Sequence, residues 1–256
     1  MAGFFDSIGS VQTMNEAQTI RNAVANVSHM RQMVRADARL QASVAAVKRF
    51  QARRFAQTYG DLAVDPRYQA ATGFFLTELY GERDCDERDA QFAKVAGALQ
   101  RLIPPAALRT AVSLSELHGL SERLDFTMGQ AWLAHGATGF SSAIRYMKCW
   151  RTVSRRAQRA LRLPTVLDIG DELGRLTKIG GLRLMLSAMR GPASMAGLES
   201  LQLFLESGFD AFKSLTTLDG GPQKFLELIR NRETRQIELL FDGTEEAVRT
   251  ALQIEA

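Results

Sequence analysis

The stretch PPAALRTAVSLSELHGLSERLDFTMGQAWLAH, residues 104–135, decides the fold class of this chain. Its apolar residues recur every three or four positions from Leu108 to Trp132 and stay in phase through Gly119, which places them on one face of an α-helix. Two prolines precede the pattern, and proline suits the first turn of a helix because its missing N–H would have had no partner there. The stretch therefore predicts one long helix, or two kinked halves, that ends near His135.

The same spacing continues on both sides of this stretch. No glycine or proline lies between Gly9 and Gly60, so one helix or a pair of helices can run from Val11 to Thr58. We expect a break near Asn26–Ser28, where capping-type side chains compete for the backbone. Strand-like alternation with Asn-Gly or Asp-Gly turns is essentially absent. The sequence thus predicts an all-α protein, a multi-helix bundle of about eight to ten helices with no sheet.

Further helices are expected on the remaining apolar patterns. Asp65 and Pro66 predict the cap and first turn of a helix over residues 67–80, and the acids at 84–86 suit the positive end of the next helix dipole. A basic helix is expected to end at Leu163, just before a proline. These later helices are expected over residues 140–163, 165–178, 182–190, 194–215, 223–241 and 244–254.

The same patterns suggest how the chain divides. We expect residues 1–25 to form an N-terminal segment that can be helical, and residues 26–256 to form a single integrated helical domain. The glycines at 136–139 are the best internal boundary, and each piece on either side is long enough for a bundle. No flexible linker separates the pieces, so the sequence leaves open whether there are one or two cores.

The composition excludes several classes of protein. The chain has 256 residues, 46% of them hydrophobic, with 32 basic and 28 acidic side chains, which is unlike a disordered chain, a collagen or a disulfide scaffold. Cys85 and Cys149 show neither a CxxC motif nor metal-ligand spacing. The first residues lack the apolar run of a secretory signal, and no apolar stretch is long enough to span a membrane. We expect a cytoplasmic protein with no transmembrane segment.

Catalytic motifs are missing from the sequence. There are three histidines and no HExxH, Glu-x-x-His, GxxxxGK or GxSxG motif. The acids of 84–89 lack the central glycine and the terminal glutamate of a calcium loop. We therefore expect no metal site, no cofactor and no catalytic residue, although the sequence leaves open whether the chain is an enzyme.

A cationic stripe is expected along the basic helix at 140–163, which carries no acid. At about 100° per residue its basic side chains, Arg156 included, share one side, opposite Ile144 and Trp150. Such a stripe could bind phosphate groups or an acidic protein surface, or it could pack against the acidic segment 78–89 of the same chain. The candidate anion-binding or partner-binding residues are Arg145, Lys148, Arg151, Arg155, Arg159 and Arg162.

A second basic stretch, Arg21 to Arg54, contains a single acid, Asp37. Its charges are scattered around the helix rather than aligned on one face, so we expect them to be solvated.

Residues 51–91 carry a specific string of motifs, which reads QARRFAQTYGDL, then PRY, FFLTELYG and RDCDERDAQ. This string resembles that of a family of uncharacterised bacterial helical proteins with the pattern QxxRFxxTYxDL, PRY, FFLxxLYG and RDxxxRDxQ. The resemblance covers roughly Arg39 to Glu233. The resemblance implies an all-helical, integrated unit. It supplies no activity and no catalytic residue.

The resemblance also points to a polar cluster at two helix junctions. Half-buried charges must be paired to be tolerated, so one hydrogen-bonded network could fix the register of these helices. Alternatively, the cluster could line a pocket for a small ligand or a partner. Its candidate members are Arg54, Tyr59, Asp61, Arg67, Tyr68, Glu78, Tyr80, Asp84, Arg88 and Asp89.

These observations favour a non-enzymatic protein that binds another macromolecule. An acidic protein or an anionic membrane surface could bind the cationic stripe, and self-association is a further expectation. Nucleic acid is the less expected partner, because no aromatic residues interleave the arginines. The alternative hypothesis is a small-molecule-binding helical bundle, or an enzyme, with a pocket near Arg54, Tyr59, Arg67 and Glu78.

Overall fold

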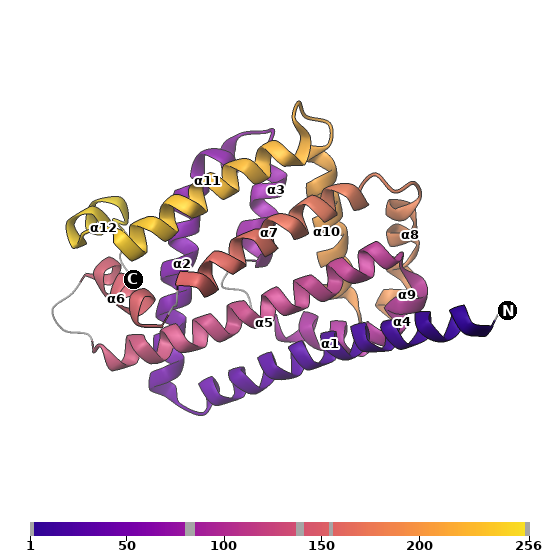
Figure 1. Ribbon diagram of the computed structural model, residues 1–256, viewed down its shortest axis with the longest axis horizontal. Helices are drawn as coiled ribbons and strands as arrows, with labels where there is room; N and C mark the ends of the chain where they lie inside the picture. The colour runs from indigo at the N-terminus through magenta and orange to yellow at the C-terminus, as the bar shows by residue number, and fades with distance from the viewer. Residues whose placement is uncertain (1–2, 80–84, 137–140, 154–155, 254–256) are drawn as a thin grey trace.

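The computed structural model describes the backbone of residues 3–79, 85–136, 141–153 and 156–253. Within these ranges the chain forms twelve α-helices, one π-helix and no strand, which confirms the all-α class (Figure 1). The expected number of helices is too low, because some predicted helices are divided. The elements are α1 (Gly3–Arg35), α2 (Ala38–Val64), α3 (Gln69–Phe74), the π-helix η1 (Phe75–Leu79), α4 (Asp86–Leu102), α5 (Pro105–Ala134), α6 (Ser142–Val153), α7 (Arg156–Leu176), α8 (Leu182–Ala188), α9 (Arg190–Met195), α10 (Glu199–Leu215), α11 (Gly221–Asp242) and α12 (Glu245–Ala251).

The long axis of the molecule is roughly followed by α1, α5, α7 and α11 (Figure 1). α5 contacts both α1 and α7, and α7 in turn contacts α11. Other helices cross this layer: α2 packs on α5, α10 packs on α7, and α3 contacts both α2 and α10. Because α5 lies in the middle of this arrangement, its side chains meet those of both the long and the crossing helices.

Aromatic side chains form much of the core. Where α3, η1, α10 and α11 meet, the ring of Phe75 lies 5.8 Å from that of Phe225 and 6.1 Å from that of Phe212. Where α2 meets α6, the rings of Phe50 and Tyr146 stack at 4.4 Å. Burying one such side chain contributes about 1.5–3 kcal/mol, so these clusters hold helices that are distant in sequence.

The N-terminal helix is continuous. The prediction of a helix break near Asn26–Ser28 is wrong. The expected boundary between an N-terminal segment and the helical domain, after residue 25, falls inside α1. Ile20, Val24 and Val27 are buried on one face of α1, which contacts α4 and α5, so tertiary packing outweighs the local capping preference. The chain turns instead at Asp37, whose carboxylate caps α2 by accepting two backbone N–H bonds of 2.8 and 3.2 Å.

The prediction of one basic helix over residues 140–163 is also wrong. α6 ends at Val153, and α7 begins at Arg156 and continues through Pro164. A proline inside a helix removes one hydrogen bond, which is why the sequence predicts a helix end at Leu163. Pro164 is exposed, whereas Val166 and Leu167 just after it are buried in the aromatic core. Packing of α7 against α10 and α11 therefore keeps the helix intact.

The prediction of a long helix that ends near His135 is confirmed, whereas the helix predicted over residues 67–80 is divided. The apolar pattern between Leu108 and Trp132 lies in one unbroken helix, α5, from Pro105 to Ala134. The helix expected over 67–80 is the short α3 followed by the π-helix η1. π-helices are rare and often lie at functional sites, which draws attention to the side chains that η1 presents.

Candidate functional site

A cavity of about 240 Å³ lies between the long and the crossing helices. It is larger than the roughly 150 Å³ apolar cavity that admits benzene, so a molecule bigger than one aromatic ring fits. α4, α5, α7, α8 and α10 supply most of its walls, and these walls are mainly apolar. Representative apolar lining residues are Phe74, Phe92, Ile169, Leu173, Leu205 and Phe209.

The cavity exists partly because α5 faces it with small side chains, Ala107, Ala111 and Ser115 among them. The three hydroxyl groups that α5 presents are satisfied within the helix. Thr110, Ser115 and Ser121 donate to backbone carbonyls at 3.0, 2.7 and 2.8 Å, respectively. This part of the wall therefore behaves as an apolar surface toward a ligand.

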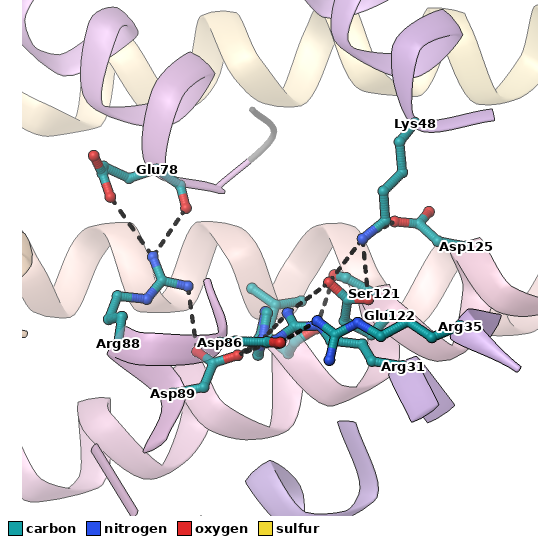
Figure 2. A network of polar contacts seen from close by, with 12 residues as sticks. Arg31, Arg35, Lys48, Glu78, Asp86, Arg88, Asp89, Ser121, Glu122 and Asp125 are labelled. Atoms are coloured by element: carbon teal, nitrogen blue, oxygen red, sulfur yellow. Dashed lines mark hydrogen bonds and ion pairs between the residues drawn. The ribbon is translucent and has the colours of Figure 1, made fainter. Parts of the chain in front are cut away.

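Arg31 of α1 organises the charged part of the cavity wall (Figure 2). Its Nη1 lies 2.5 Å from Asp86 Oδ1 and 3.0 Å from Asp89 Oδ2, and its Nη2 lies 3.0 Å from Glu122 Oε1. Arg35, one turn later, also pairs with Asp86. These ion pairs join α1 to α4 and α5. We refer to one group of polar residues that line the cavity as the charged wall: Lys48, Glu78, Arg88, Asp89, His118, Glu122 and Asp125; Arg162 of α7 lines the cavity as well.

Lys48 connects the charged wall to α2 (Figure 2). Its Nζ lies 2.9 and 3.0 Å from the two carboxylate oxygens of Glu122 but 4.0 Å from Asp125 Oδ2. Burial raises the pKa of Asp125, and Lys48 and a 2.8 Å hydrogen bond from Gln51 only partly oppose it. Burial also opposes ionisation of Glu122, but Lys48 and Arg31 outweigh it and lower the pKa of Glu122. Asp125 is thus the carboxyl of this pair that holds a proton more readily.

Arg88 and His118 hold the other end of the charged wall. Arg88 Nη1 lies 3.6 Å from Glu78 Oε2, and Arg88 Nη2 lies 3.5 Å from Asp89 Oδ1. His118 Nε2 lies 2.8 Å from Asp89 Oδ2. Burial opposes ionisation of Asp89, but the hydrogen bond to His118 and two neighbouring guanidinium groups together outweigh burial and lower the pKa of Asp89. Asp89 therefore stays charged although it is buried.

A smaller chamber of about 50 Å³ adjoins the cavity, and we call it the inner chamber. The two spaces share lining residues, including Gln51, Phe75 and Arg162. In the inner chamber, Arg54 Nη2 lies 3.5 Å from Glu233 Oε2. The polar residues of its lining are Gln51, Arg54, Tyr59, Thr72, Arg162 and Glu233.

The polar cluster expected from the sequence is not one network. Tyr59 OH donates to Glu233 at 2.7 Å, so Tyr59 and Arg54 belong to the inner chamber. Glu78, Arg88 and Asp89 belong to the charged wall instead. The cluster divides because α2 turns the first group toward α11, whereas η1 and α4 turn the second group toward α5 and α1.

The remaining members of the cluster lie elsewhere. Arg67 pairs with its neighbour Asp65 at 2.6 Å, and its side chain is 63% exposed, so its expected place in a pocket is wrong. Asp61 pairs with Arg232 at the surface, and the hydrogen bonds from Arg232 lower the pKa of Asp61 to about 2. Tyr68 is buried with its ring 5.8 Å from that of Phe225. Tyr80 and Asp84 lie outside the described residues.

The described members of the cationic stripe contact the C-terminal part of the same chain. Lys148 Nζ lies 3.2 Å from Glu245 Oε1, and Arg156 pairs with Asp242. Arg151 donates to the carbonyls of Leu240 at 2.8 Å and Gly243 at 2.6 Å. These carbonyls lie at the C-terminal end of α11, where a helix attracts cations because its last carbonyls have no partner within the helix.

The other members of the stripe point in different directions. Arg145 donates to the carbonyl of Trp132 and lies 4.3 Å from the centre of its ring. Arg162 lines both the cavity and the inner chamber. Arg155 and the side chain of Arg159 lie outside the described part of the chain. The contacts of Lys148, Arg151 and Arg156 thus lie at α11 and α12 rather than at the acidic segment 78–89.

The sequence patterns did not indicate several residues of these sites. Arg31 and Lys48 belong to the basic stretch that we expected to be solvated, yet both are half-buried in ion pairs. The sequence did contain one pattern that points to the charged wall. His118, Glu122 and Asp125 follow each other at spacings of four and three, so they share a face of α5. Three polar side chains on one side of a largely apolar helix could have indicated a polar site.

Among the described residues, no group of three or more His, Cys, Asp or Glu side chains is arranged to hold a metal ion. No helix in the described ranges combines the length and the apolar composition needed to cross a membrane.

Comparison with known proteins identifies one family. A family model described as a domain of unknown function (DUF8198) matches residues 30–247, a span that contains the charged wall and, apart from Val24, the residues that line the two internal spaces. No curated protein and no solved structure matches the chain.

Proposed function

The chain belongs to the family of domains of unknown function DUF8198, and from its cavity we propose that it binds a small amphipathic molecule between its helices. The observation that carries this proposal is a space of about 240 Å³ that is apolar over most of its lining and charged on one wall. Small-molecule sites are typically concave and largely apolar, with a few polar groups that orient the ligand.

The apolar lining supplies affinity in this proposal. Side chains of α7, α8 and α10, such as Leu173, Leu186 and Phe209, face the same space as Phe92 of α4. Each Å² of apolar ligand surface removed from water contributes about 25 cal/mol, so a hydrocarbon or aromatic body would be stabilised here.

The polar lining supplies orientation. Ion pairs of the charged wall are anchored on four different elements, α1, α2, α4 and α5, so their positions depend on several helix contacts rather than on one mobile loop. Glu78 and Phe75 of the π-helix line the same space. A ligand with both an apolar body and a polar group would match both kinds of wall.

Binding without catalysis fits the reactive groups of the cavity best. Cys85 lines the cavity, and burial raises the pKa of its thiol, which leaves less of the reactive thiolate at neutral pH. Asp89 and Glu122 are held as charged partners of arginine and lysine. Structural ion-pair networks also perturb pKa values, so the lowered pKa values of these carboxyls do not require a role in a reaction.

Binding of another macromolecule through the cationic stripe stays a prediction from the sequence, as do a bacterial source and a cytoplasmic location. Three basic side chains of the stripe, those of Lys148, Arg151 and Arg156, contact α11 and α12 of the same chain. We therefore favour the small-molecule hypothesis over an acidic partner or an anionic membrane surface.

Filling the cavity tests the proposal. Ala111 lines the cavity, so Ala111→Leu should lower the affinity for an uncharged apolar probe, N-phenyl-1-naphthylamine, by about tenfold, which corresponds to about 1.4 kcal/mol. Fluorescence titration measures this affinity. The matched control is Glu116→Leu, which adds the same side chain at an exposed position of α5 and should bind the probe like the original protein. Equal probe affinity in all three proteins would contradict a ligand site in this cavity.

A further inference from the structure

A buried hydroxyl group marks the inner chamber. Thr72 of α3 lines the chamber and is only 2% exposed, yet its Oγ1 has no hydrogen-bond partner among the described residues. Helical threonines often donate to a carbonyl one turn earlier, as Thr110 does to Ala106 at 3.0 Å. The backbone N–H of Thr72 donates to the carbonyl of Tyr68 at 2.8 Å, but the hydroxyl of Thr72 does not. Because a buried polar group without a partner is costly, this hydroxyl points to a bound group that hydrogen-bonds it.

The charged side chains of the inner chamber already face opposite charges. Arg54 Nη2 lies 3.5 Å from Glu233 Oε2, and Arg162 interacts electrostatically with Asp125 of the charged wall. A ligand with a charged head would add one more buried charge to these pairs, which costs more than burying an uncharged polar head. The charges around the chamber therefore favour an uncharged head.

The inner chamber offers both a donor and an acceptor to such a head. The hydroxyl of Thr72 can donate or accept, whereas the carboxylate of Glu233 only accepts. A carboxylate has about four acceptor sites, so Glu233 can accept a hydrogen bond from a ligand in addition to the one from Tyr59. A hydroxyl head accepts through its oxygen and donates through its proton, so it suits both groups, whereas a carbonyl head only accepts.

Size and connection define the shape of the ligand. About 10–15 Å³ accommodates one water molecule and about 150 Å³ admits benzene, so the inner chamber of about 50 Å³ has room for a hydroxyl group on a carbon chain but not for a ring. Gln51, Phe75 and Val166 line both spaces, so a group in the inner chamber adjoins the larger apolar cavity. One molecule can therefore place a small head in the chamber and a hydrocarbon body in the cavity.

We propose that the ligand is an uncharged amphipathic alcohol whose hydroxyl group binds in the inner chamber, hydrogen-bonded to Thr72. This inference rests on the proposed function and adds the chemical class of the ligand. The apolar cavity binds the hydrocarbon body, and the Thr72 hydroxyl gains the partner that the described residues do not supply.

Two ligands of the same chain length separate the head from the body. Octanol and 1-chlorooctane differ in that only octanol has a hydroxyl group, and the affinity of each is measured by displacement of N-phenyl-1-naphthylamine. Transfer out of water by itself favours 1-chlorooctane, because octanol loses hydrogen bonds to water. The ratio of the two affinities, compared between protein variants, therefore isolates what the protein contributes to the hydroxyl group.

Thr72→Val identifies the position of the head. The variant keeps the shape of the side chain and removes its hydroxyl, so affinity for octanol should fall about tenfold while affinity for 1-chlorooctane stays the same. The melting temperature of the unliganded variant should be unchanged or higher, because a buried hydroxyl without a partner is removed. Thr72→Ser keeps the hydroxyl and should retain the affinity for octanol.

The matched control is Thr110→Val. It makes the same substitution at a hydroxyl that is satisfied within α5 and that lines only the larger cavity. The ratio of the affinities for octanol and 1-chlorooctane should therefore equal that of the original protein.

Octanoate tests the charge of the head and should bind at least about tenfold more weakly than octanol, because its carboxylate brings a further buried charge. Tighter binding of octanoate than of octanol would overturn the inference and leave binding in the cavity intact. So would a ratio of octanol to 1-chlorooctane affinity that Thr72→Val leaves unchanged. Failure of both octanol and 1-chlorooctane to displace the probe would contradict the proposed function as well.

Discussion

At the scale of single residues, guanidinium groups determine which buried carboxylates keep their charge. Glu206 of α10 is 7% exposed. Arg190 Nε lies 2.7 and 3.0 Å from its two carboxylate oxygens, and Gln202 Nε2 donates to it at 2.7 Å. The hydrogen bonds from Arg190 are the largest influence and lower the pKa of Glu206 to about 2. The charged form of Glu206 thus stabilises the contact between α10 and α9.

This contact predicts a pH-dependent stability. In the unfolded chain Glu206 returns to its ordinary pKa of 4.5, so its contribution is fully present above that pH and is lost as the pH falls toward 2. Glu206→Gln should lower the free energy of unfolding at pH 7 by about 1 kcal/mol. The difference in melting temperature between the two proteins should shrink between about pH 4.5 and 2. A difference that stays constant over this range would contradict an ionised Glu206.

At the scale of secondary-structure elements, the closest approach of α5 to α2 depends on a missing side chain. A Cβ atom added at Gly129 would lie 2.3 Å from Val44 Cγ2 and 3.1 Å from Val44 Cα. A Cβ atom added at Gly119, in the same helix, would meet nothing within 4 Å. The two glycines therefore offer a matched pair of sites for the same substitution.

Substituting alanine at each position tests this packing. Gly129→Ala should lower the free energy of unfolding by about 1–3 kcal/mol, because α2 and α5 must move apart. Gly119→Ala should raise the free energy of unfolding by about 0.5–1 kcal/mol, because alanine loses less backbone entropy in a helix. Urea denaturation measures both changes. A stabilising effect at both positions would show that α2 and α5 do not approach this closely.

At the scale of the whole molecule, segments of opposite charge neutralise each other across long sequence distances. Arg31 and Lys48 of the N-terminal basic stretch pair with acids of α4 and α5. Three residues of the cationic stripe, Lys148, Arg151 and Arg156, instead contact the end of α11 and the start of α12. A net charge of +4 therefore coexists with internal pairings between segments of opposite charge.

The contacts of Arg151 predict that α12 depends on α6. Arg151→Met leaves the carbonyls of Leu240 and Gly243 without this donor, so amide hydrogen exchange in α12 should become faster. The control, Arg109→Met, removes an exposed arginine of α5 and should leave exchange in α12 unchanged. Equal exchange rates in both variants would contradict this role for Arg151.

The sequence by itself determined that the chain is helical, because helix formation depends on neighbours three or four positions away. The apolar spacing from Leu108 to Trp132 correctly predicted α5. Helix ends were less predictable, since burial of α1 and of the residues after Pro164 outweighs local capping and proline effects.

Only the tertiary structure decided the sites. Arg31 meets Asp86 and Glu122 across 55 and 91 positions of the chain, and no local spacing specifies such pairs. Likewise, the cavity forms where small side chains of α5 face helices that do not fill the space. Charge and side-chain size can be read from a sequence, but which charges meet, and where a space is left, depends on how whole helices pack.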